Sequence, residues 1–204
     1  CKEVAAVLPA LLLALDSVTP QIGTVSAGRL WVRAARTVPF WAMAIGHLAF
    51  LSGPVWAYNS GLLDPVYLWG RLAGALETFA RYLGLLAVPI GMRPFYDLPR
   101  PDSLLAFWPL LGGLLALALL LLLWRLWAAI PAAAFGLAWL LIALVPVVDL
   151  VALSPRPMGL ADRYLYLPSI GFLLFAVGLI DGAVARLGGR LARGPAAAAI
   201  AFAV

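Results

Sequence analysis

The chain has 204 residues, of which 65% are hydrophobic and 11% are charged, and its formal net charge is +5. A soluble domain carries about a quarter charged residues, so a water-soluble globule of this size could not cover its surface, and lipid must cover much of the outside. The positive charge is almost all Arg lying between apolar runs, which favours membrane lipids over nucleic acid as the partner. The single Cys1 excludes an internal disulfide framework and a multi-cysteine zinc site.

The apolar runs predict an all-α fold, a polytopic transmembrane helix bundle. An uncharged run of about 20 residues forms a helix about as long as the hydrocarbon core is thick. Both ends of the sequence interrupt an apolar run, so we expect the chain to be an internal piece of a longer protein. The expected spans lie near residues 4–20, 39–58, 104–124, 127–149 and 165–187, with a truncated one at 196–204.

Residues 71–92 have a different pattern. Leucines and other apolar residues recur there at steps of three and four, which places them on one face of a helix. Glu77 and Arg81 lie off that stripe and are spaced as a helix-supporting pair. We therefore expect an amphipathic helix lying in the membrane interface, and a helix packed flat against the spans is an equal alternative. The apolar stripe consists of Leu72, Leu76, Phe79, Leu83, Leu86 and Ile90.

With residues 71–92 lying flat, the basic residues divide equally between the two sides of the membrane. On one side, the clusters at 29–36 and 186–193 contain Arg without acidic partners, apart from the distant Asp181, and are typical of cytoplasmic anchors. On the other side, basic residues alternate with acidic residues, Tyr and Pro. That second pattern indicates a binding site.

Three polar segments lie on this second side: the start of the first span, a Pro-rich loop at 91–102, and residues 161–169. Arg and Lys bind phosphate through charge-assisted hydrogen bonds, and Tyr can hydrogen-bond a sugar or stack on it. A lipid-linked phosphosugar beside an acyl groove would use both. The candidate substrate-binding residues are Lys2, Glu3, Arg93, Tyr96, Asp97, Asp162, Arg163, Tyr164 and Tyr166.

Each of these residues also has an ordinary structural interpretation. Arg93 and Arg163 could be headgroup anchors, and Tyr164 and Tyr166 could belong to an interfacial aromatic belt. Asp162 could orient or neutralise the Arg163 guanidinium. The sequence contains no paired-cysteine metal motif, Gly-rich phosphate loop or nucleophile elbow, so we assign no metal ligand and no cofactor from it.

Three motifs together resemble a known family. Residues 1–9, CKEVAAVLP, are similar to the Ser-Lys-Glu-Thr-Ala-X-X-Leu-Pro segment of multi-spanning glycosyltransferases that carry tetratricopeptide repeats. Residues 81–97, RYLGLLAVPIGMRPFYD, resemble the central amphipathic segment of that family, and residues 161–172, ADRYLYLPSIGF, are the most specific match. The motifs occur in the family's order. Cys1 stands where the family usually has Ser, and Asp149 where Asn is common.

The resemblance implies that residues 1–204 form the C-terminal half of a GT-C-like transmembrane domain, similar to protein O-mannosyltransferases. Such an enzyme would transfer a sugar from a polyprenyl-phosphate carrier to a protein or glycan hydroxyl, outside the cytoplasm, in a bacterial inner membrane. Arg163 would hold the donor phosphate, with Tyr166 and Lys2 nearby. The family's catalytic carboxylate lies upstream of these motifs, so we expect no catalytic residue here and no activity from this piece alone.

Two alternatives stay open. The chain could belong to an O-antigen ligase-like enzyme or another enzyme of lipid-linked glycans, which would have a large extracytoplasmic loop upstream. It could also be a non-enzymatic membrane anchor for tetratricopeptide repeats, which would not need an acidic first loop.

Overall fold

The computed structural model describes residues 7–18, 35, 37–46, 65–91, 93–96, 101, 103–148 and 160–193. All regular elements in these ranges are helical, so the all-α prediction is confirmed for them. Two β-type residues, Tyr96 and Leu160, form an isolated antiparallel bridge. The helices are α1 (Leu8–Val18), Thr37–Gly46, α3 (Pro65–Ala87), α4 (Phe107–Ala129), α5 (Pro131–Leu144), the 3-10 turn η2 (Asp162–Leu165) and α6 (Tyr166–Arg193).

Two of these helices are long and apolar enough to cross a membrane, and they correspond to two predicted spans. Phe107–Ala129 corresponds to the span expected at 104–124, and Asp162–Arg186 to the one expected at 165–187. α1 lies within the span expected at 4–20, and Thr37–Gly46 covers the first part of the one expected at 39–58. The remaining residues of those two spans, and all of 196–204, lie outside the described residues.

The predicted boundary between the spans at 104–124 and 127–149 is wrong. The sequence predicts a break at residues 125–126, but α4 continues through Arg125 to Ala129, and α5 begins at Pro131. Proline lacks a backbone N–H and fits the first turn of a helix, where that donor has no partner. The preceding Ile130 is extended, with φ −147° and ψ 80°, as a residue before proline prefers. α5 is therefore shorter than the span expected at 127–149.

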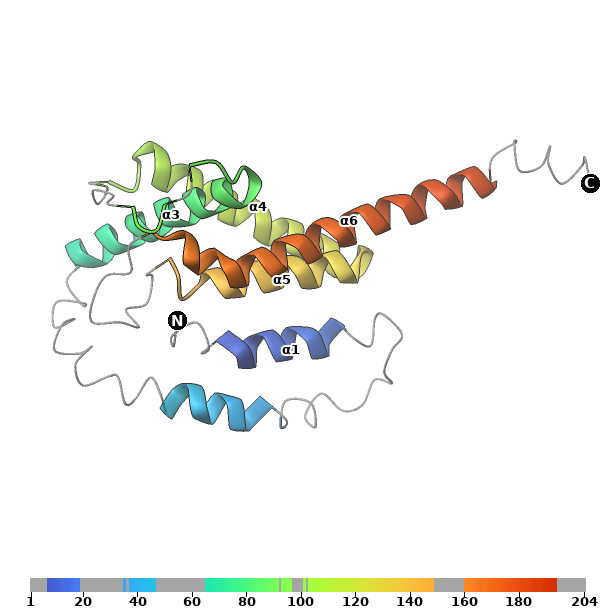
Figure 1. Ribbon diagram of the computed structural model, residues 1–204, viewed down its shortest axis with the longest axis horizontal. Helices are drawn as coiled ribbons and strands as arrows, with labels where there is room; N and C mark the ends of the chain where they lie inside the picture. The colour runs from blue at the N-terminus through green and yellow to red at the C-terminus, as the bar shows by residue number, and fades with distance from the viewer. Residues whose placement is uncertain are drawn as a thin grey trace, which may run out of the picture.

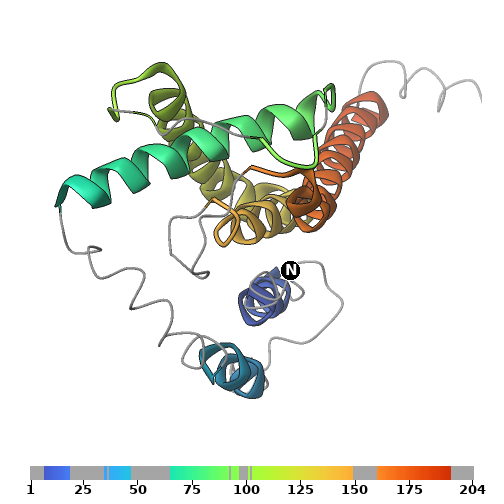
Figure 2. The same cartoon turned by 60° about the vertical axis from the view of Figure 1, so that its left-hand side comes forward.

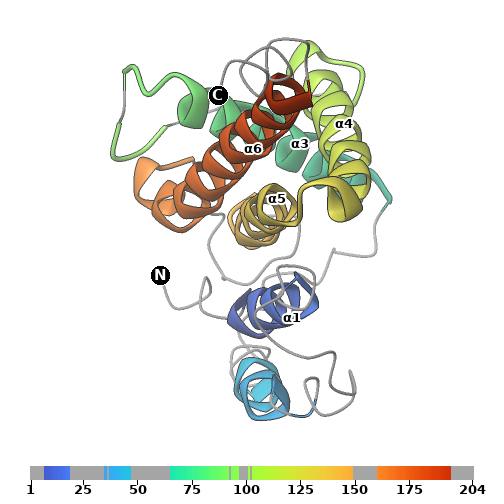
Figure 3. The same ribbon diagram turned by 90° about the vertical axis from the view of Figure 1, so that its right-hand side faces the viewer.

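α5 occupies the centre of the structure. It lies between α1 and α6 (Figure 1), and an end-on view shows α1 on one side of it and α3, α4 and α6 on the other (Figure 3). Ala133, Leu137, Leu140 and Leu144 are all buried. A helix that is apolar on every face needs such surroundings, because no face of it is suited to water.

The backbones of α5 and α6 approach each other closely at glycines. A Cβ atom added to Gly136 of α5 would overlap the backbone of Phe175, and one added to Gly171 of α6 would overlap the backbone of Leu140. Small residues allow this approach, which maximises van der Waals contact between apolar helices. The contact determines where the first turns of α6 lie.

α3 runs across the other helices rather than along them. Figure 2 shows it crossing the direction of α1, α5 and α6, which are seen nearly end-on. It begins at Pro65 and ends at Ala87, whereas the sequence predicted 71–92. The predicted ion pair is present, with an oxygen of Glu77 2.8 Å from the Arg81 guanidinium.

The predicted apolar stripe is not the most buried face of α3. Ala73, Glu77, Ala80 and Tyr82 are buried, as is Phe79 of the stripe, whereas Ile90 lies beyond the end of α3 and is 78% exposed. The leucines of the stripe are only partly buried. The reason is that α3 packs closely on α4, where small side chains let the two helices approach. The alternative of a helix packed flat against other helices therefore describes α3 better than an isolated surface helix.

The crossing of α3 and α4 predicts different effects at two adjacent glycines. A Cβ atom on Gly112 would overlap the Leu76 backbone carbonyl, whereas one on Gly113 would lie 3.8 Å from Leu76 Cδ1. We expect Gly112→Ala to lower the free energy of unfolding by about 1–3 kcal/mol, because the helices must separate. Gly113→Ala should leave it unchanged or raise it slightly. Thermal unfolding in detergent, followed by circular dichroism, tests this, and equal melting temperatures would contradict the crossing.

Candidate functional site

The structure brings two of the three predicted polar segments together. The Tyr96 N–H donates to the Leu160 carbonyl at 2.8 Å, and the Asp162 N–H donates to the Arg93 carbonyl at 3.5 Å. The loop that follows α3 therefore lies against the segment that leads into α6. Lys2 and Glu3, from the third segment, and Asp97 lie outside the described residues.

Tyr96 orients the Asp162 carboxylate. Its hydroxyl accepts a hydrogen bond from the Arg93 N–H at 3.0 Å, and its single proton can go to Asp162 Oδ1 at 3.1 Å or to the Gly91 carbonyl at 3.2 Å. Desolvation and the hydrogen bond to Asp162 raise the pKa of the Tyr96 phenol above its ordinary value. The phenol therefore stays neutral and keeps a proton to donate.

A second tyrosine, Tyr82 of α3, contacts the same segment from its other side. Its side chain has 0% exposure. The Ala161 N–H donates to the Tyr82 hydroxyl at 3.2 Å, and that hydroxyl donates to the Ala161 carbonyl at 3.4 Å. Burial raises the pKa of the Tyr82 phenol well above its ordinary value. It is thus held in the protonated form that both donates and accepts.

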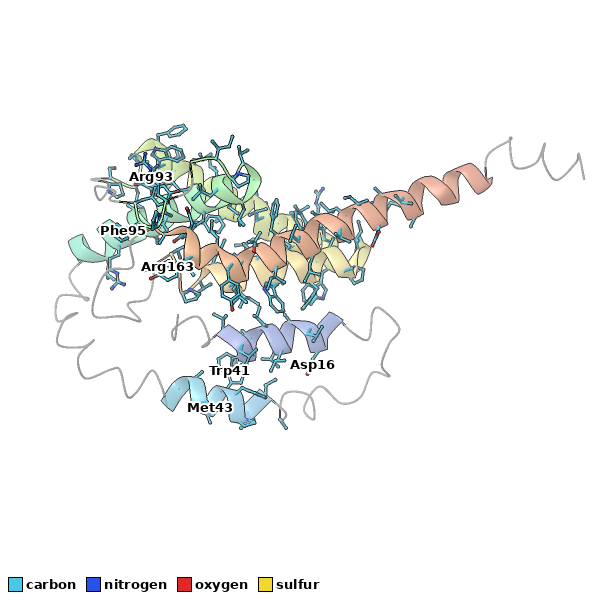
Figure 4. The ribbon with its side chains drawn as sticks, viewed as in Figure 1. Asp16, Trp41, Met43, Arg93, Phe95 and Arg163 are labelled. Atoms are coloured by element: carbon cyan, nitrogen blue, oxygen red, sulfur yellow. The ribbon has the colours of Figure 1, made fainter. Side chains whose placement is uncertain are left out.

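Arg163 is exposed at the start of α6 and is held by its neighbour. Its guanidinium lies 5.0 Å from the centre of the Tyr164 ring and donates to the Tyr164 hydroxyl at 3.3 Å. No ion pair joins it to Asp162 in the described part of the chain, so Tyr164 has the orienting role considered for Asp162. Figure 4 shows Arg93 and Arg163 at the same end of the structure.

An open groove of about 340 Å³ lies between the end of α3 and the start of α6. Its polar lining comes from Asp162, Tyr166 and Ser169, which all belong to η2 and the first turn of α6. The Ser169 hydroxyl donates to the Tyr166 carbonyl at 2.8 Å, and Tyr166 is 69% exposed. The groove is therefore mainly apolar, and its polar groups all come from the wall formed by η2 and α6. Its apolar lining is Leu85, Leu86, Pro89, Leu165, Phe172 and Leu173.

A cation–π contact joins α3 to the start of α4. The Arg81 guanidinium lies 4.3 Å from the centre of the Trp108 ring, while its Nε donates to Glu77 at 2.8 Å. A guanidinium placed over an aromatic face is attracted by the negative charge of that face. The sequence predicted the ion pair, but not the contact with Trp108.

Sequence reasoning did not include two residues of this region. Tyr82 lies three residues after Phe79 on a buried face, and a buried phenol needs a hydrogen-bond partner. That signal was available in the sequence, although the partner Ala161 was not. Ser169 lies within the predicted 161–169 segment and had no assigned role.

The polar side chains brought together here are those of Asp162, Arg163, Tyr166 and Ser169. Within the described ranges, no three His, Cys, Asp or Glu side chains are grouped closely enough to hold a metal ion. Comparison of the chain with protein-family models, with curated proteins and with solved structures found no match.

Proposed function

We propose that this chain is part of a membrane glycosyltransferase that takes its sugar from a polyprenyl-phosphate carrier. The groove between α3 and α6 carries this proposal, because its lining is mainly apolar and includes the polar residues Asp162, Tyr166 and Ser169. A polyprenyl-phosphate sugar has the same division, with a long apolar chain on one side of the phosphate and a sugar on the other. Apolar sites with a few placed polar groups are typical of such ligands.

The charge beside the groove suits the leaving group of the reaction. When the sugar leaves its carrier, negative charge gathers on the donor phosphate, and fixed donors that face this charge lower the barrier. Arg163 presents an exposed guanidinium that Tyr164 already orients. Arginine can bind two phosphate oxygens at once. The acceptor hydroxyl would lose its proton to a carboxylate that, by the family resemblance, lies upstream of this chain.

The proposed setting is a multi-pass arrangement in a bacterial inner membrane, with the groove at the extracytoplasmic boundary. α4 and α6 have the required length and apolarity, and the groove lies at the start of α6. Arg125 lies near the end of α4, and the basic run 186–193 lies at the far end of α6. These two groups would face the cytoplasm. α3, which crosses the other helices in Figure 2, would then lie along the membrane surface.

Two single-cysteine variants test this placement in a Cys1→Ser background. Ser103 precedes α4 and Ala128 is near its end, and both are exposed. We expect Ser103→Cys to react with an impermeant maleimide in intact cells, and Ala128→Cys to react only after the membrane is opened, because α4 crosses the bilayer between them. Reaction of both from one side would show that α4 does not cross.

The groove predicts a difference between two neighbouring positions of α6. Leu173 lines the groove, whereas Val177, one turn later, is exposed and outside it. In the full-length protein, Leu173→Trp should raise the KM for a polyprenyl-phosphate sugar by roughly tenfold, because losing a few buried methylenes of ligand contact costs about 1–2 kcal/mol. Val177→Trp should leave it unchanged. Steady-state transfer assays measure both, and equal KM values would place the donor elsewhere.

The arginine assignment predicts that lysine will not replace Arg163. In the full-length protein, Arg163→Lys keeps the charge but loses the two-pronged hydrogen bonding, at a cost of about 1.5–3 kcal/mol. Sugar transfer should therefore fall by roughly tenfold to a hundredfold, and by more in Arg163→Ala, with normal expression. Transfer measured at limiting and saturating donor tests this. A headgroup anchor would behave differently, because a point charge suffices there, and full activity of the lysine variant would remove Arg163 from the site.

A further inference from the structure

The two walls of the groove belong to different pairs of helices. One wall is the end of α3, which packs mainly on α4, and the other is the start of α6, which packs mainly on α5. Packing within each pair does not by itself determine the distance between the walls. The pairs are joined by packing between α4 and α5, and by a direct connection between α3 and the segment that leads into α6.

Tyr82 makes this connection. It lies one helical turn before Leu85 and Leu86, which line one wall. Its hydroxyl is hydrogen-bonded to Ala161, the residue before Asp162 on the other wall. Tyr82 and Ala161 both have 0% exposure. The connection is therefore buried and lies directly beside the groove in both segments.

The hydroxyl of Tyr82, rather than its ring, holds the segment. In the described part of the chain, the Ala161 N–H has this hydroxyl as its hydrogen-bond partner, at 3.2 Å. A buried N–H without a partner is strongly unfavourable, since water cannot replace the lost acceptor. If the hydroxyl were removed, the segment would have to move until water reached Ala161. The Tyr96 bonds would still attach the segment from its other side, so the fold would persist while the groove changed.

We infer that Tyr82 is a positioning residue that sets the distance between the two walls of the groove through its hydrogen bonds to Ala161. It does not itself line the groove, and it acts through Ala161 on Asp162 and Tyr166. The ligand of the groove rests on the proposed function. The hydrogen bonds of Tyr82 and their effect on the distance between the walls do not depend on the proposed function.

The test is Tyr82→Phe in the full-length protein, with Trp69→Phe, at an exposed position of the same helix, as the matched control. Nitroxide labels at Gly84→Cys and Ile170→Cys, in a Cys1→Ser background, report the distance between the walls without filling the groove. Gly84 has open space for a side chain, and Ile170 is exposed. In Tyr82→Phe we expect a shifted or broader distance distribution and roughly tenfold or more faster amide exchange at Ala161. Trp69→Phe should match the wild type in both measurements.

Two further measurements keep the outcomes distinct. In the wild-type protein, the Ala161 amide should exchange as slowly as the core amides of α5, and rapid exchange would overturn the inference even if Tyr82→Phe cannot be purified. An unchanged wall distance in a folded Tyr82→Phe variant would also overturn it. The KM for the polyprenyl-phosphate sugar should rise in Tyr82→Phe with little change in kcat. If the wild type transfers no sugar, the proposed function fails, while the label distances and amide exchange still decide the role of Tyr82.

Discussion

The close backbone contact between α5 and α6 determines where the first turns of α6, which form one side of the candidate site, lie. Glycine at Gly136 and Gly171 lets the two helices approach until side chains no longer separate them. Apolar helices in lipid gain little from burial alone, so such close packing is a main source of their association. Because most of α5 is buried in the core, the start of α6 is attached to the centre of the structure. The wall of the groove that α6 forms is therefore attached to the core.

α3 completes the groove because it lies across this support. Two contacts fix it there, the crossing at Gly112 and Leu76 and the buried hydrogen bonds between Tyr82 and Ala161. They differ in kind: the first depends on the absence of a side chain, and the second on a single hydroxyl. The groove is thus built from two helix pairs, which are also joined by the packing of α4 on α5. Small changes at those interactions should alter the groove without unfolding the helices.

Three tyrosines hold the backbone and the charged side chains of the candidate site in place through hydrogen bonds. Tyr82 holds Ala161, Tyr96 orients Asp162, and Tyr164 holds the Arg163 guanidinium. For Tyr82 and Tyr96, the raised pKa keeps the phenol neutral, so each can donate to one group while accepting from another. The charged side chains at this end are consequently held by neutral partners. Asp162 and Arg163, although adjacent and both described by the structure, form no ion pair with each other, so the Arg163 guanidinium stays available for an anionic ligand such as a phosphate.

Much of the fold follows from the sequence, because helix formation and apolarity are local properties. The apolar runs predicted α4 and α6, the spacing of Glu77 and Arg81 predicted their ion pair, and the polar segments at 91–102 and 161–169 were expected on one side. The boundary at Pro131 could also have been read from the sequence, since proline at the first turn of a helix is a local signal. The predicted break at residues 125–126 follows the charge of Arg125 instead, but one charged residue near the end of an apolar run does not end a helix.

Other features depend on contacts between residues distant in the chain, and the sequence contains no local signal for them. Nothing in the pattern of α3 shows that Glu77 is buried while the leucines of the stripe are only partly so, because that depends on how closely α4 approaches at Gly112. Nothing in residues 161–169 shows that Ala161 bonds to Tyr82, or that Tyr164 rather than Asp162 holds Arg163. The sequence by itself determined the helices, their apolarity and the residue types available for binding. Only the tertiary structure decided which of those residues meet, because that depends on the distances between helices, and close packing at a few glycines and one buried hydroxyl sets those distances.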